Sequence, residues 1–369
     1  MKLTCAAVAP VAVLLAGCAT LPDAGTLVAA PVEFKTVAGA PAVRDGRAQF
    51  RSAFCSLMQA DGLLPEQGAD CSSWLWRMPG EPQGVVAPGA AGIGAALDGA
   101  GRPALPTAIP AVVLVTGAFS ECVGDEARPF RAAAEQLGAR GGRVETIVVS
   151  GRSGTAHNAA QLAEALERGG FDDGQGLVLI GYSKGTLDIL RFLVDFPEHA
   201  GRVAAVVSVA GPVFGSPLAD KAGPAYGALL AKLPYAKCPP GDGNVIRSLS
   251  PAAATRWLEE NELPRHVRYY SLAAFATRER VARALVPSWK LLNKTDIRND
   301  GQVIAADAVI PGSTLLGYAN ADHWGIAESI ETVHKVLAAR PDPTPFPLDQ
   351  LFRAILWFVA DDLRADTGD

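Results

Sequence analysis

The chain has 369 residues, 49% of which are hydrophobic, and its formal net charge of −5 is spread over both signs. This length allows one large α/β domain with extensions. No basic stripe runs through the sequence, so nucleic acid is not expected as a partner.

The first residues predict export. Residues 3–17 form an apolar run of 15 residues after Lys2, whereas a membrane-spanning helix needs about 20. The sequence Leu15-Ala16-Gly17-Cys18 resembles a bacterial lipobox, which implies cleavage before Cys18 and acylation of that cysteine; an ordinary signal peptide is the alternative. The residue after the cysteine is Ala19 rather than Asp, and in this the sequence resembles the outer-membrane lipoproteins of Gram-negative bacteria. We therefore expect a signal peptide over residues 1–17 and an exported protein held at the outer membrane by its N-terminal lipid anchor.

The next segments predict a tether and a small extension. Residues 18–45 are rich in Ala, Pro, Val and Gly and suit a flexible tether. Residues 46–100 are expected to form an N-terminal helical extension and a linker. The tryptophans at 74 and 76 would pack against the core or line an entrance to the site.

Four cysteines remain once Cys5 is removed and Cys18 is acylated. An even number in an exported protein favours disulfides. A metal site is the weaker alternative, because the spacing matches no common zinc pattern. Proximity in the chain pairs Cys55 with Cys71 and leaves Cys122 with Cys238, although sequence alone does not fix the connectivity.

The remainder, residues 101–369, alternates apolar strands with helices. This alternation predicts an α/β fold with a doubly wound, mostly parallel sheet, in which ligands bind at the carboxyl ends of the strands. The alternation stops over residues 213–266, which we expect to form a helical cap above the sheet or to pack beside it. A helix over 347–363 is expected to cover one face of the sheet, or to touch a membrane. The expected strands are 111–117, 144–149, 177–180, 203–209, 267–273 and 314–318, with helices at 127–137, 158–168 and 252–261.

A G-x-S-x-G pattern follows the strand at 177–180. Gly181-Tyr182-Ser183-Lys184-Gly185 stands between this apolar strand and a helical pattern at 187–193. Such a sharp turn between strand and helix exposes a serine hydroxyl above the sheet, and its glycines allow the two elements to pass closely. The pattern predicts Ser183 as a nucleophile.

A serine needs a base to remove its proton, and histidine is the usual base near neutral pH. Of the five histidines, His323 stands in a loop just after the last apolar strand, from which it could reach the turn at Ser183. His157 and His199 precede or flank the strand that leads to Ser183, which is the wrong order for this fold. His266 stands at the amino end of a strand, and His334 is expected inside a helix.

A carboxylate must orient the histidine. The candidates are Asp296, Asp300, Asp307 and Asp322. Asp300 is favoured because Asn299-Asp300-Gly301 predicts a turn that exposes the carboxylate on a fixed backbone. Asp322 adjoins the histidine and would struggle to reach its ring.

Together these motifs resemble an α/β hydrolase, and more narrowly the bacterial lipases and esterases. In those lipases an Asn-Asp-Gly aspartate likewise precedes the catalytic histidine by a little over twenty residues, and here the gap is 23. The run 209–220 is also similar to the lipase segment after the strand that follows the serine. The sequence departs from many of these lipases at Thr116-Gly117, where they have His-Gly, and at Tyr182, where they have a histidine.

The resemblance implies two backbone donors for the oxyanion, which are the N–H of Lys184 and an N–H after Gly117, from Ala118 first or Phe119 second. It also implies hydrolysis of carboxylic esters, of which lipids and polyesters are examples, through an acyl-enzyme with no metal or organic cofactor. Transfer of the acyl group to an envelope lipid or sugar is an alternative function. A lipid-anchored binding protein without catalytic activity is another.

Overall fold

The computed structural model describes residues 22–65, 70–82, 110–171, 176–221, 239–329, 335, 339–342 and 344–367. The predicted signal peptide, Cys18 and Cys238 lie outside these ranges. Within them, no helix combines the length and apolar character needed to cross a membrane.

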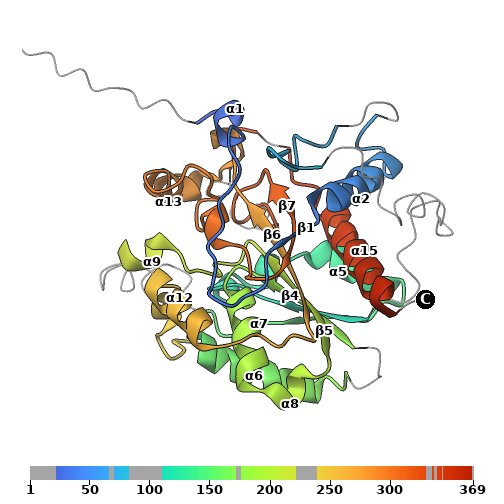
Figure 1. Ribbon diagram of the computed structural model, residues 1–369, viewed down its shortest axis with the longest axis vertical. Helices are drawn as coiled ribbons and strands as arrows, with labels where there is room; N and C mark the ends of the chain where they lie inside the picture. Colours follow the sequence, from blue (N-terminus) through green and yellow to red (C-terminus); the bar gives the residue numbers. More distant parts are fainter. Residues whose placement is uncertain are drawn as a thin grey trace, which may run out of the picture.

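One sheet of seven parallel strands organises the fold (Figure 1), in the spatial order β1-β7-β6-β5-β4-β2-β3. The predicted parallel sheet is thereby confirmed, since each pairing between neighbouring strands of this sheet is parallel. The strands are β1 (Arg44–Asp45), β2 (Ala111–Val115), β3 (Val144–Ile147), β4 (Leu177–Tyr182), β5 (Val203–Val209), β6 (Arg268–Ala274) and β7 (Thr314–Ala319).

Helices cover both faces of this sheet (Figure 1). One face carries α2 (Arg47–Ala60), α5 (Arg131–Ala139) and α15 (Leu348–Thr367), and the other carries α6 (Thr155–Arg168), α7 (Lys184–Asp195), α8 (Pro197–Ala200) and α12 (Pro251–Glu260). Shorter helices are α1 (Ala24–Leu27), α4 (Ser120–Val123), α9 (Pro217–Lys221), α11 (Val245–Ser248) and α13 (Val286–Leu292). The 3-10 turns are η1 (Asp125–Ala127), η2 (Arg278–Arg280), η3 (Arg283–Leu285) and η4 (Ala305–Asp307).

The central strands are buried on both sides, which explains their continuous apolar sequences. Successive side chains point to opposite faces of a strand. In β2, Val112 and Leu114 therefore pack with α5 and α15, whereas Val113 and Val115 pack with α6 and α7. The predicted helix at 347–363 corresponds to α15 and covers one face of the sheet, with residues such as Phe352 buried there.

The N-terminal extension is fastened to the domain. The predicted disulfide between Cys55 and Cys71 is confirmed, with the two Cα atoms 5.7 Å apart. Trp76 packs against the core, which was one of the two alternatives for the tryptophans. Its ring stacks on that of Phe275, and its Nε1–H donates to the Phe275 carbonyl at 2.8 Å. Cys122 is also disulfide-bonded, and the predicted partner, Cys238, lies outside the described residues.

The segment expected to be a tether differs from that expectation where the structure describes it. Leu27 and Val32 are buried, and the Lys35 ammonium pairs with Asp307 at 2.7 Å. Strand β1 adds to the edge of the sheet beside β7. These apolar and backbone contacts hold residues 22–45 against the domain.

The segment 213–266 is described in part. Its helix α12 packs through Leu258 into the hydrophobic cluster shared with α6 and α7. Residues 222–238 lie outside the described ranges, so a cap over the site stays a prediction.

Candidate active site

Ser183 lies in the sharp turn between β4 and α7, at the carboxyl end of the sheet. Its backbone has φ 53° and ψ −130°, which a residue with a side chain rarely adopts. A Cβ atom at Gly181 would lie 2.5 Å from the Thr186 Cα, and one at Gly185 would lie 2.5 Å from the Val115 carbonyl oxygen. The two glycines therefore permit the close passage of strand, turn and helix that exposes the serine.

The structure brings Ser183, His323 and Asp300 together in one hydrogen-bonded chain. His323 Nε2 lies 2.8 Å from Ser183 Oγ, and His323 Nδ1 lies 2.7 Å from Asp300 Oδ2. Because a carboxylate only accepts hydrogen bonds, Nδ1 is the donor to Asp300. Nε2 is then left with its lone pair facing the serine hydroxyl, the arrangement required of a base.

Backbone donors fix the Asp300 carboxylate. Its Oδ1 accepts hydrogen bonds from the N–H groups of Gln302 (2.8 Å) and Val303 (2.7 Å), while Oδ2 faces the histidine. Asn299 Oδ1 accepts from the Gly301 N–H at 3.0 Å, and Gly301 has φ 96°, so the Asn-Asp-Gly sequence forms a tight turn. Asp300 is fully buried, which keeps water from competing for its oxygens.

The other candidate carboxylates have different partners. Asp296 pairs with Arg298 at 3.2 Å, and Asp307 pairs with Lys35. Asp322 pairs with Arg340 at 2.8 Å and accepts the Ala282 N–H at 2.6 Å. Of the four carboxylates considered, Asp300 is the one in contact with the His323 ring.

Tyr182 is a residue that the sequence reasoning did not assign. Its hydroxyl donates to the His323 carbonyl oxygen at 2.7 Å, and the two ring centroids are 5.4 Å apart. Burial, followed by the nearby Glu328 and Asp300 charges, raises the pKa of Tyr182 well above its ordinary value, so the hydroxyl stays a neutral donor. The only signal in the sequence was its place next to the serine, where many lipases have a histidine.

The expected oxyanion donors come from two segments next to Ser183, the start of α7 and the loop after β2. Lys184 is the first residue of α7, where a helix leaves N–H groups without partners in the helix. Gly117 approaches the serine closely, since a Cβ atom on it would lie 3.0 Å from the Ser183 Cβ. Ala118 follows this contact. The Phe119 N–H instead donates to the Gly151 carbonyl at 3.1 Å, which favours Ala118 over Phe119 as a donor.

The Lys184 side chain is buried beneath the turn. Its ammonium contacts Asp188 Oδ1 at 2.6 Å, and Asp188 Oδ2 accepts from Asn158 Nδ2 at 2.8 Å. Burial raises the pKa of Asp188, an effect that the Lys184 charge and the Asn158 hydrogen bond oppose. The lysine ammonium therefore points into the protein rather than toward a substrate.

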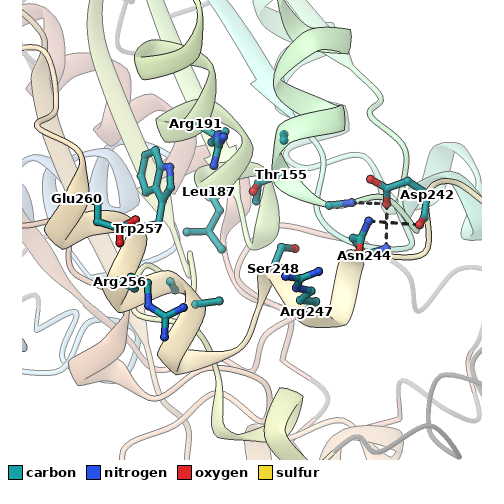
Figure 2. A pocket seen from close by; sticks show the side chains of 14 residues that line it. Thr155, Leu187, Arg191, Asp242, Asn244, Arg247, Ser248, Arg256, Trp257 and Glu260 are labelled. Carbon is teal, nitrogen blue, oxygen red and sulfur yellow. Dashed lines mark hydrogen bonds between the residues drawn. The ribbon is translucent and has the colours of Figure 1, made fainter.

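A pocket of 500 Å³ lies between α6, α7, α11 and α12 (Figure 2). Leu187 lines it from α7 and Trp257 from α12, and Asp242 accepts hydrogen bonds at its rim from the N–H groups of Gly154 and Asn244, both at 2.8 Å. The described residues that line this pocket include none of Ser183, Asp300 and His323, so we do not assign it to the reaction.

Comparison with solved structures finds an extensive similarity to a carboxyl esterase. A metagenomic carboxyl esterase, MGS0156, is 37% identical to this chain, with a TM-score of 0.74, over 89% of this chain and 97% of that one. The mature lipase BlEst2 of Bacillus licheniformis is 23% identical over 69% of this chain and 94% of its own, with a TM-score of 0.51. No protein-family model matches the sequence, and no curated protein matches it significantly. The sheet and its flanking helices are those of an α/β-hydrolase fold, as predicted.

Proposed function

This chain belongs to the α/β-hydrolase family that contains the metagenomic carboxyl esterase, and from that premise we propose that it hydrolyses carboxylic esters with Ser183 as the nucleophile. The observation that carries the proposal is the hydrogen-bonded chain from Ser183 Oγ through the His323 ring to Asp300. A serine in this setting can lose its proton as it attacks.

The first half of the reaction forms an acyl-enzyme. His323 Nε2 takes the Ser183 proton while Oγ bonds to the ester carbonyl carbon, and the carbonyl oxygen becomes an oxyanion. Asp300 stabilises the imidazolium that results, because its carboxylate faces Nδ1 in a buried setting. The ester bond then breaks, and the alcohol leaves with the proton from Nε2.

The oxyanion needs donors that are already in place when its charge develops. We assign this role to the backbone N–H groups of Lys184 and Ala118. The close approach of Gly117 to Ser183 supports the assignment of Ala118. Each such donor lowers the activation barrier by about 2.7–4 kcal/mol.

The second half hydrolyses the acyl-enzyme. Water replaces the alcohol, His323 removes its proton, and the new tetrahedral intermediate collapses to the carboxylic acid and free Ser183. In both halves of the reaction, Ser183 forms and breaks the covalent bond to the acyl group, and His323 transfers the protons. Asp300 orients the His323 ring, and water is the second nucleophile.

Substitution of the nucleophile tests the proposal. Ser183→Ala should lower kcat for a p-nitrophenyl ester by ~10⁴-fold or more and should abolish labelling by a fluorophosphonate probe. Ser248→Ala is the matched control. Ser248 lines the pocket of Figure 2 and is not part of the hydrogen-bonded chain of Ser183, His323 and Asp300. Full activity in Ser183→Ala would disprove the proposed function.

We also propose that the enzyme acts at a membrane surface, anchored through an acylated Cys18. The lipobox-like sequence at 15–18 supports this location. Ester substrates held in or near a membrane would then lie within reach of the site.

A further inference from the structure

A buried charged network lies directly behind the proposed nucleophile. Lys184 is 1% exposed, and Asp188 and Asn158 are fully buried. The Lys184–Asp188 pair joins successive turns of α7, and Asn158 Nδ2 links that pair to α6. The proposed chemistry uses the Lys184 backbone but leaves its ammonium and the Asp188 carboxylate without a role.

The network is also connected to the loop after β2, which contains Ala118 and Phe119. Asn158 Nδ2 donates to the Ser150 carbonyl oxygen at 3.0 Å as well as to Asp188. The next residue, Gly151, accepts the Phe119 N–H at 3.1 Å. A Cβ atom on Gly151 would lie 2.6 Å from the Phe119 nitrogen, so the backbones at 151 and 119 are in direct contact. Phe119 in turn follows Ala118.

We propose that Lys184, Asp188 and Asn158 are positioning residues that hold both oxyanion donors in register. Through its ammonium, Lys184 fixes the first turn of α7 and hence its own N–H. Through Asn158, Ser150 and Gly151, the same network fixes the loop that carries the Ala118 N–H. This inference rests on the proposed esterase function, and it adds a role for side chains that do not touch the substrate.

Two physical arguments support a positioning role. An oxyanion donor is effective only if it already points at the position that the charged oxygen will occupy, and a misplacement of about 1 Å can reduce the rate about 100-fold. A buried ion pair contributes little net stability compared with apolar residues of the same volume. A contribution to stability therefore does not explain why a lysine and an aspartate occupy these positions. Fixing the geometry of the oxyanion donors explains the presence of both charges.

Asp188→Asn is the first test, with Asp195→Asn as its matched control. The control removes a carboxylate from the Arg191–Asp195 pair, which has the same four-residue spacing on the same helix but is partly exposed. We expect Asp188→Asn to lower kcat ~10- to 100-fold with KM within twofold of wild type. Asp195→Asn should change neither constant by more than twofold.

A trifluoromethyl ketone separates positioning from a merely structural effect. It adds to the serine and places an oxyanion between the two donors, so its inhibition constant reports on donor geometry. In Asp188→Asn, this constant should rise by the factor by which kcat/KM falls. A variant that unfolds more readily, yet keeps the wild-type kcat and inhibition constant while folded, would overturn the inference.

The double variant Lys184→Met/Asp188→Asn keeps the test decisive if the single variant fails to fold. It removes the network without leaving an unpaired buried charge, which is the change that folding tolerates least. We expect it to show the same losses in kcat and in inhibitor affinity, and wild-type values would overturn the inference. Ester hydrolysis that survives Ser183→Ala in the same assay would instead disprove the proposed function.

Discussion

Tyr182 fixes the backbone of His323 from outside the proposed triad, and its hydroxyl can be removed without changing the ring. Tyr182→Phe should lower kcat ~3- to 10-fold, because the histidine loop loses its hydrogen bond to the turn at the nucleophile. It should also lower the unfolding free energy by about 1 kcal/mol. Steady-state kinetics and urea unfolding measure the two effects.

Tyr270→Phe provides the comparison for that substitution. Tyr270 is also a buried tyrosine, and its hydroxyl donates to Asp362 at 2.7 Å, away from the site. Its loss should reduce stability to a similar extent while kcat stays unchanged. An equal fall of kcat in both variants would contradict a specific role for Tyr182.

Glu328 makes stability depend on pH. Burial, and then the Asp322 charge, raise the pKa of Glu328 well above its ordinary value of 4.5. As the pH rises above 4.5, the unfolded chain releases this proton first, so the native state loses stability until the pH passes the native pKa. Glu328→Gln removes this loss.

The stability difference between Glu328→Gln and wild type should therefore grow in favour of the variant as the pH rises. Each unit between the two pKa values corresponds to about 1.4 kcal/mol. Urea unfolding of both proteins at pH 4, 6 and 8 measures the trend, and the comparison cancels titrations that both proteins share. A difference that does not change with pH would contradict the prediction.

Some residues of the site could be predicted from sequence and others could not. Ser183 and Asp300 lie in local turn patterns, and His323 follows a recognisable last strand. Tyr182 contacts the histidine backbone across a separation of 141 residues, so no local pattern reveals the contact. The four-residue spacing of Lys184 and Asp188 is visible in the sequence, but the same spacing is typical of an exposed helix pair, and only their burial distinguishes them.

At the scale of elements, the disulfide joins α2 to the segment that contacts the end of β7. A loop of about 15 residues closed by a disulfide is stabilised by ~3 kcal/mol in the chain-entropy account, and the separation between Cys55 and Cys71 is 16 residues. The variant Cys55→Ala/Cys71→Ala should therefore lose ~3 kcal/mol of unfolding free energy. Denaturant unfolding with and without a reductant measures the change.

The same variant should keep its kcat at temperatures where it is folded, because α2 packs against α15 and β7 rather than against the hydrogen-bonded chain. Reductant should have a smaller effect on the variant than on wild type. The disulfide of Cys122 accounts for any effect that remains. Unchanged stability in the double variant would contradict the prediction.

The elements themselves were predicted unequally. Strands β2, β4 and β5 are buried and have apolar sequences, which made them easy to locate before the structure was known. Strand β3 contains Glu145 and Thr146 and is only partly buried, so its apolar signal is weaker. Strand β1 has only Arg44 and Asp45, both exposed, and its pairing with β7 comes from backbone hydrogen bonds that leave no apolar pattern. For the same reason, residues 18–45 suggested a tether, since isolated contacts such as that of Lys35 with Asp307 have no periodicity.

At the scale of the whole molecule, the parallel topology gathers the site from distant parts of the chain. Ser183 follows β4, Asp300 lies between β6 and β7, and His323 follows β7. Because parallel strands end at one edge of the sheet, the loops after them meet there. The chain order of serine, aspartate and histidine was therefore informative, whereas the contacts between helices on the same face, such as those of α2 with α15 and of α6 with α7, required the structure.

The proposed lipid anchor determines where the whole molecule is located in the cell. It can be tested by replacing the sulfur atom of Cys18 with oxygen. When the full chain is expressed in a bacterium that processes lipoproteins, the wild-type protein should incorporate radiolabelled palmitate and sediment with membranes. Cys18→Ser should abolish both, because acyl chains contribute about 0.8 kcal/mol per buried methylene and their attachment atom is lost. Cys5→Ser, in the segment expected to be removed, should change neither. The rate with a soluble ester should be equal in all three proteins, and a Cys18→Ser protein that stays on the membrane would contradict the anchor.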